Sequence, residues 1–147
     1  MRKMKSNKAL KPAVLFCAGG SIYILVEILW RAVRGSTPTH WTMFILGGLC
    51  FLFIGAINEY FTWETPFWLQ AVVGGAGVLA LEFIFGLVLN LWLNLGVWDY
   101  SDEPLNILGQ VCLPFAFAWV LLSAVAIVLD DYLRYWLFKE EKPRYKF

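Results

Sequence analysis

Four long apolar stretches dominate the sequence, over approximately residues 12–33, 41–61, 67–90 and 107–129. The apolar core of a bilayer is roughly 30 Å thick, so a helix needs about 20 apolar residues to cross it. Each stretch reaches that length. The boundaries predict an all-α integral membrane protein, a bundle of four transmembrane helices in a single membrane domain that spans residues 1–147.

Composition supports a membrane setting. The chain is 60% hydrophobic, whereas an average soluble domain is about 45–50% apolar. No small-residue cleavage site follows the first apolar stretch, so we expect that stretch to remain as a membrane anchor. Cys17, Cys50 and Cys112 each lie inside or beside an apolar run without a second ligand at metal-binding spacing. We therefore expect them to act as small hydrophobic residues.

The basic residues are concentrated in the two tails. Of the 12 lysines and arginines, all but Arg31 and Arg34 fall within residues 1–11 or 134–147. Four spans place both tails on one side, and the positive-inside rule makes that side cytoplasmic. Basic tails can also bind nucleic acid, but tails that flank apolar spans favour the topological interpretation. We expect a bacterial plasma-membrane protein with both termini in the cytoplasm and no nucleic-acid partner.

The connector between the third and fourth stretches mixes aromatic and acidic residues in the run L-W-L-N-L-G-V-W-D-Y-S-D-E-P-L-N, residues 91–106. Tryptophan and tyrosine favour the headgroup level of a membrane. This composition predicts a loop on the outer face that hugs or re-enters the membrane. Pro104 and Asn106 suit the start of the helix that follows.

Ionisable residues inside a span are costly, and they usually face the interior of a bundle. A rise of 1.5 Å per residue puts both Glu27 and Glu82 about 22 Å from the inner end of their helices, in the outer half. Helical spacing places Glu82 and Asn90 on one face of the third helix with Gly75 and Gly86. Small residues on a shared face allow helices to pack closely in lipid. We expect Glu82 to face the interior, within reach of Glu27, Arg31 or the W-D-Y segment at 98–100, and Arg31 is the partner best placed to meet it.

These residues predict a polar site for a substrate or a cation in the outer half of the bundle. Glu27 and Arg31, four residues apart, could instead form a purely structural ion pair. Glu59 and His40 are better explained as interfacial residues. The predicted binding residues are Glu27, Arg31, Glu82, Asn90, Trp98, Asp99 and Tyr100.

Several catalytic signatures are absent from the sequence. It contains no glycine-rich phosphate loop, no H-E-x-x-H motif, no nucleophile elbow and no cysteine cluster. We therefore expect no cofactor, no metal ion and no nucleotide-binding module in this chain, and we favour transport over catalysis.

Several motifs of the chain are typical of one family. They are E-F-I-F-G at 82–86 with Asn90, W-D-Y-S at 98–101, N-I-L-G-Q at 106–110 with Leu113, Glu27, Trp30 and Arg31, and His40 with Gly47 and Gly48. The motifs cover nearly the whole chain, and W-D-Y-S followed by N-x-x-G-Q is the most specific. Together they resemble a known bacterial family, the putative ABC-transporter type IV or CmpB-like permease family. The resemblance implies a small multi-pass membrane protein with the role of a transporter permease.

Three functions fit these observations. The first is a transport protein or permease-like subunit with the polar site described above, which would suit cation binding or proton-coupled exchange. The second is an intramembrane enzyme or binding protein for lipid-linked substrates, in which paired carboxylates act as acid and base. The third is a non-catalytic assembly or regulatory protein. The expected partners are membrane lipid, a second copy of the chain in a homo-oligomer, and a further transporter subunit.

Overall fold

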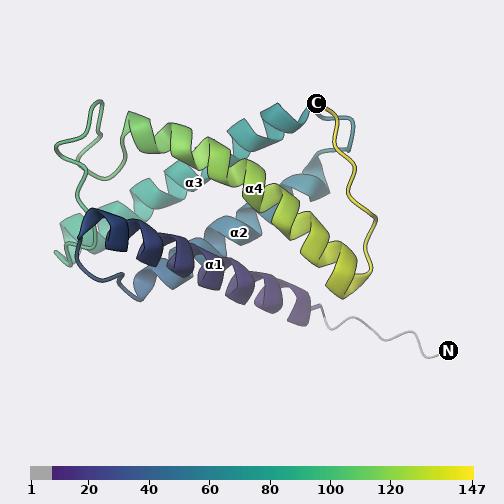
Figure 1. The fold of residues 1–147 in the computed structure, drawn as a ribbon, viewed down its shortest axis with the longest axis horizontal. Coiled ribbons are helices and arrows are strands. Elements are labelled where there is room, and N and C mark those ends of the chain that lie inside the picture. Colours follow the sequence, from purple (N-terminus) through teal and green to yellow (C-terminus); the bar gives the residue numbers. More distant parts are fainter. Residues whose placement is uncertain (1–7) are drawn as a thin grey trace.

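The computed structural model describes residues 8–147, and within that range the chain is helical without any strand. The helices are α1 (Leu10–Arg34), α2 (Thr42–Tyr60), α3 (Phe67–Gly86) and α4 (Leu113–Phe138) (Figure 1). A π-helical turn, η1 (Leu87–Trp92), continues α3. All 4 helices found in the described range are long and apolar enough to span a membrane. The predicted all-α architecture is confirmed.

The start of α1 and the end of α4 lie together, because Lys11 forms an ion pair with Glu140. The C-terminal segment then returns to the start of α3, where the Phe67 N–H donates to the Lys146 carbonyl at 2.7 Å (Figure 1). We call this the tail end of the bundle, and the opposite end, which holds residues 93–112, the loop end. Of the predicted amino-terminal tail, residues 1–7 lie outside the described range.

Glycines set how closely α1 and α2 approach each other. A Cβ atom at Gly19 would lie 2.1 Å from the Cβ of Phe51, and one at Gly47 would lie 2.3 Å from the Cβ of Tyr23. The aromatic side chain of each helix therefore occupies the space left by a glycine of the other. The predicted small face of α3 is used in the same way, since a Cβ at Gly75 would lie 2.6 Å from Val120 on α4.

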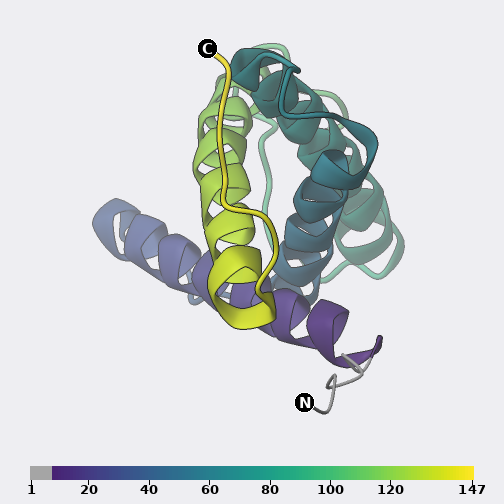
Figure 2. The ribbon, with the colours of Figure 1, turned by 90° about the vertical axis from the view of Figure 1, so that its right-hand side faces the viewer.

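The helices pack as two close pairs, α1 with α2 and α3 with α4, and α2 contacts both α3 and α4. By contrast, α1 and α4 touch at few points. Figure 2 shows α1 running at a clear angle to α4. The two helices consequently leave space between them that neither backbone fills.

The fourth helix begins at Leu113 and ends at Phe138, so the predicted span of 107–129 starts too early and ends too early. Before the helix, Leu108 and Gly109 have positive φ angles of 54° and 70°, which place them in a tight turn. Pro114 then lies in the first turn of the helix, where its missing N–H costs nothing. At the C-terminal end of α4, the helix continues through polar residues, and Asp130, Asp131 and Arg134 there each form a hydrogen bond with another side chain.

The connector between η1 and α4 folds back over the loop end. The Asn90 side chain accepts a hydrogen bond from the Val97 N–H at 2.7 Å and donates to Gln110 Oε1 at 2.8 Å. The Trp98 indole donates to the Gln110 carbonyl at 3.0 Å. These bonds bury Val97, which is 5% exposed, and they fix the connector against the helices.

Candidate functional site

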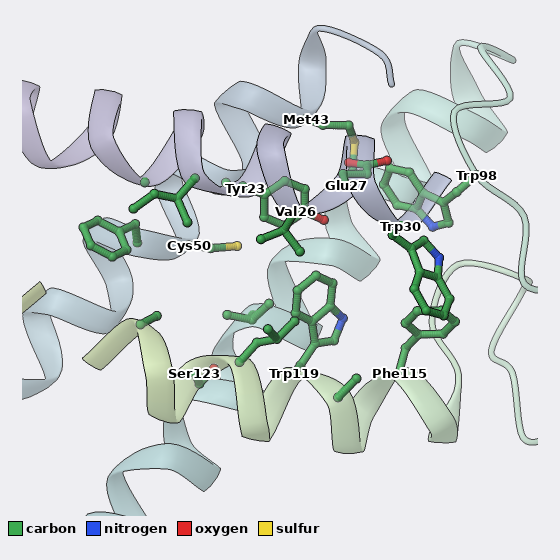
Figure 3. Close-up of a pocket in the computed structure, with 18 of the residues that line it drawn as sticks. Tyr23, Val26, Glu27, Trp30, Met43, Cys50, Trp98, Phe115, Trp119 and Ser123 are labelled. Atoms are coloured by element: carbon green, nitrogen blue, oxygen red, sulfur yellow. The ribbon is translucent and has the colours of Figure 1, made fainter. Parts of the chain in front are cut away.

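A cavity of about 800 Å³ occupies the space between α1 and α4, from the loop end to the middle of the bundle. Figure 3 shows Glu27 and Trp30 on α1 facing Phe115 and Trp119 on α4, with Trp98 at one end. Cavities of this size hold drug-sized ligands. Its aromatic lining residues are Tyr23, Trp30, Phe51, Trp98, Tyr100, Phe115 and Trp119.

Aromatic pairs join the walls of the cavity. The ring of Tyr23 on α1 stacks on Trp119 on α4, with ring centres 5.8 Å apart. Trp30 meets the edge of Phe115 at 5.9 Å, and Tyr100 of the connector stacks on Phe115 at 4.7 Å. Such pairs contribute roughly 0.5–1.5 kcal/mol each beyond their buried area. The rings thus bridge the gap that the helix backbones leave.

The polar end of the cavity contains the predicted pair of Glu27 and Arg31, whose side chains are each 13% exposed. Arg31 Nε donates to Glu27 Oε1 at 2.7 Å, and Arg31 Nη2 donates to the Val97 carbonyl at 2.8 Å. Arg31 Nη1 donates to the carbonyl and hydroxyl oxygens of Thr37. All three guanidinium nitrogens are therefore engaged. In contrast, Glu27 Oε2 is buried without a hydrogen-bond partner among residues 8–147.

Glu82 faces the bundle interior, as predicted, and is 1% exposed. Its Oε1 accepts a hydrogen bond from the Tyr100 hydroxyl at 3.0 Å, and its Oε2 accepts one from the Trp119 indole at 2.7 Å. Of the expected neighbours, Tyr100 of the W-D-Y segment is a partner, whereas Arg31 turns toward Val97 and Thr37 instead. Glu82 is not among the cavity-lining residues, so it lies behind the wall and holds two side chains that form it.

The connector residues Asp99 and Tyr100 have different roles. The Asp99 carboxylate accepts hydrogen bonds from the hydroxyl and N–H of Ser101, and these bonds hold the pKa of Asp99 below its ordinary value. Burial, followed by the neighbouring Glu82 carboxylate, raises the pKa of the Tyr100 hydroxyl. Tyr100 is therefore a stable neutral donor to Glu82, and Asp99 shapes a turn at the rim of the cavity.

The structure brings most of the predicted site residues to one end of the bundle but divides their roles. Glu27, Arg31, Trp98, Asp99 and Tyr100 line the cavity. Asn90 is outside the lining and holds the connector through Val97 and Gln110, while Glu82 supports the wall from behind. Some of the predicted residues thus line the cavity, and the others hold the lining residues in place.

Sequence reasoning missed most of the cavity lining, including Tyr23, Trp119 and Ser123. An aromatic residue within an apolar span gives no signal that separates a lipid-facing ring from a cavity wall. Ser123 is 1% exposed, and its hydroxyl has no partner within the described range.

A second polar cluster at the tail end was also missed. Arg134 Nε donates to Asp130 Oδ2 at 2.7 Å, and both side chains pack on Gly55 of α2, where a Cβ would lie 2.6 Å from each. The adjacent Asp131 accepts hydrogen bonds from Asn58 and from the Tyr145 hydroxyl. The i, i+4 spacing of Asp130 and Arg134 was the available signal, but Arg134 was assigned to the basic tail.

A pocket of about 200 Å³ adjoins this cluster and is lined by charged residues of α1, α2, α4 and the C-terminal segment. Its acids and bases are largely paired with one another, as in the contacts of Arg134 with Asp130 and Glu59. This arrangement explains how α4 keeps buried charge near its end. It functions as a structural link between the helix ends.

Comparison with known proteins gives one family. The model of the putative ABC-transporter type IV family matches residues 14–144, which confirms the resemblance seen in the sequence. No curated protein and no solved structure matches the chain. The four apolar helices and the family match together identify a membrane protein and fit a role in membrane transport. The chain belongs to the putative ABC-transporter type IV family.

Proposed function

We propose that this chain is a membrane transport protein or permease-like subunit whose substrate site is the cavity between α1 and α4. The substrate would be amphipathic, with an apolar body between the aromatic walls and a polar end near Glu27 and Arg31. The observation that carries the proposal is the combination, in one cavity of about 800 Å³, of aromatic walls and a polar pair at one end. Ligand sites are commonly apolar with a few placed polar groups.

The position of Glu82 favours transport over the enzymatic alternative. An acid–base mechanism needs both groups within hydrogen-bond reach of the substrate. Glu27 lines the cavity. Glu82 does not, because Tyr100 and Trp119 donate hydrogen bonds to its two oxygens and lie between it and the cavity. The cavity itself also argues against a purely structural role, because a helix bundle that only holds a complex together gains stability from filling such a space.

The remaining parts of the proposal concern setting and assembly. We place the protein in the bacterial plasma membrane with the tail end in the cytoplasm, because basic residues favour that side. We also propose a homo-oligomer, with a dimer as the first form to test, because the outer faces of the four helices are apolar and a single bundle of four helices encloses little space.

Uptake by proteoliposomes tests the function. The probes are ethidium, fluorescein and methylumbelliferyl glucoside, which are amphipathic dyes of positive, negative and zero charge. Ala118 lines the cavity, so the large side chain of Ala118→Trp should obstruct it and abolish uptake. Ala80 is exposed on α3, and Ala80→Trp is the matched control, which should transport like the parent protein.

The proposal predicts that at least one dye enters faster than into empty liposomes and that only Ala118→Trp stops this uptake. Uptake of no dye above the empty-liposome rate, or equal uptake by the Ala118→Trp variant, would overturn it.

A further inference from the structure

We infer that the cavity selects organic cations, with the positive group beside Glu27 and the apolar body between the aromatic rings of α1 and α4. This inference rests on the proposed function and adds the class of substrate. It follows from three features of the cavity, namely the hydrogen bonds of Arg31 within the protein, the buried oxygen of Glu27 that has no partner among residues 8–147, and the aromatic walls.

Arg31 is poorly placed to receive an anion. Its guanidinium donates to Glu27, to Thr37 and to the Val97 carbonyl. The bond to Val97 also ties α1 to the connector and closes the loop end, and the four bonds of the guanidinium leave one of its five N–H groups for an anion. Among residues 8–147, Arg31 is the one positive side chain in the cavity lining, and most of its hydrogen-bonding capacity is used within the protein.

Glu27 is the group in the cavity that is suited to bind a cation. One oxygen neutralises Arg31, whereas Oε2 is buried without a partner among residues 8–147. A buried acceptor without a hydrogen bond is destabilising because its lost hydration is not replaced, and a cationic or N–H donor on the substrate would satisfy it. Figure 3 shows Glu27 between Met43 and Trp98, at the wall of the cavity.

The side chains that line the cavity carry a net negative charge. Among residues 8–147 the charged lining residues are Glu27, Arg31 and the exposed Asp99, which leaves one more negative than positive group. Glu82 adds a carboxyl group behind the wall, and both of its partners, Tyr100 and Trp119, are neutral. A positive ligand would therefore reduce the electrostatic cost of the buried acids Glu27 and Glu82 in a low-dielectric setting.

The walls suit a cation for a separate reason. The faces of tryptophan, tyrosine and phenylalanine rings carry negative charge density and attract cations within about 6 Å, most strongly when water is excluded. Trp98 and Tyr100 of the connector and Phe115 of α4 line the same end as Glu27. A delocalised organic cation can contact these rings and the carboxylate at once.

Two ions of the same shape and opposite charge test the inference. Tetraphenylphosphonium and tetraphenylborate are titrated, by equilibrium dialysis, against the protein in nanodiscs of zwitterionic lipid, with empty nanodiscs as background. We expect saturable binding of tetraphenylphosphonium and no binding of tetraphenylborate above background. This comparison uses the unaltered protein, so it holds even if a variant fails to fold.

Glu27→Gln should weaken tetraphenylphosphonium binding by about tenfold, which corresponds to about 1.4 kcal/mol, because it keeps an acceptor for Arg31 and removes the negative charge. Asp102 is exposed on the connector and is not a lining residue. Asp102→Asn removes the same charge at the same end and should leave the affinity unchanged.

Equal affinity for the two ions, no binding of tetraphenylphosphonium, or an unchanged affinity in Glu27→Gln would overturn the inference. The dye-uptake experiment separates this failure from a failure of the proposed function. If the neutral or anionic dye is taken up and Ala118→Trp blocks that uptake, the cavity is a transport site. The same result would show that it does not select cations.

Discussion

The Trp119 indole on α4 donates a hydrogen bond of 2.7 Å to the Glu82 carboxylate on α3. The same Trp119 ring stacks on Tyr23 of α1. A buried carboxylate in the third helix thus fixes an aromatic side chain that spans the cavity between the first helix and the fourth. This relationship links the most polar position of the spans to the shape of the proposed substrate site.

Glu82→Gln should abolish dye uptake while the protein remains folded. The glutamine keeps the shape of the side chain, but its amide offers one acceptor oxygen in place of two, so Trp119 or Tyr100 loses a charge-assisted hydrogen bond worth about 1.5–3 kcal/mol. Size-exclusion chromatography and thermal unfolding in detergent check folding. Full uptake activity in this variant would show that Glu82 does not shape the site. The exposed Glu64→Gln serves as the matched control.

Gly19→Leu should destabilise the bundle, because a Cβ at Gly19 already lies 2.1 Å from Phe51. Overpacking of this kind costs about 1–3 kcal/mol or more. Ser21 is exposed on the same helix, so Ser21→Leu should change stability little. Denaturant unfolding of the two variants in mixed micelles measures the difference. Equal stabilities would contradict the packing of α1 on α2 described here.

The ion pair of Asp130 and Arg134 should show strong coupling in a double-mutant cycle. Asp130 is 0% exposed and Arg134 is 8% exposed, and removal of one partner from a buried pair costs about 3–5 kcal/mol. We expect Asp130→Asn and Arg134→Met each to lower the free energy of unfolding by about that amount. The double variant should lose less than the sum of the two. Additive losses would show that the two side chains act independently.

Both tails should be shielded from the outside of intact cells. In a background without Cys17, Cys50 and Cys112, a membrane-impermeant maleimide should label Asp102→Cys at the loop end and leave Lys146→Cys unlabelled until the cells are opened. The reverse pattern would invert the proposed topology. The basis for the prediction is the concentration of basic residues in the tails.

The number and approximate position of the helices were predictable, because length and hydropathy alone define a membrane span. The start of α4 was not, since Ile107 and Leu108 are as apolar as the residues of a span. Their placement in a turn depends on the contact of the Ile107 N–H with the Val111 carbonyl. A hydropathy profile cannot distinguish an apolar turn of this kind from the first turn of a helix.

The candidate site was predictable only in part. Helix rise placed Glu27 and Glu82 at similar depth, and helical spacing paired Glu27 with Arg31 correctly. The W-D-Y segment that contains Tyr100 was an expected neighbour of Glu82, whereas Trp119 was not. The contact with Trp119 depends on how α4 packs on α3, and the periodicity of α3 alone does not predict that packing. Trp119 and Tyr23 lie on different helices, and their stacking follows from the angle between α1 and α4.

Photolabelling with ethidium monoazide tests the central claim most directly, since it reports where a bound amphipathic cation lies. After illumination of the protein in nanodiscs, mass spectrometry should find adducts on peptides that contain Trp98, Phe115 or Trp119, and Ala118→Trp should remove them. Trp68 and Val72 are exposed on α3 and are not lining residues, so they report non-specific labelling from the lipid. Adducts confined to these lipid-facing positions, or an unchanged pattern in Ala118→Trp, would contradict the assignment of the cavity as the substrate site.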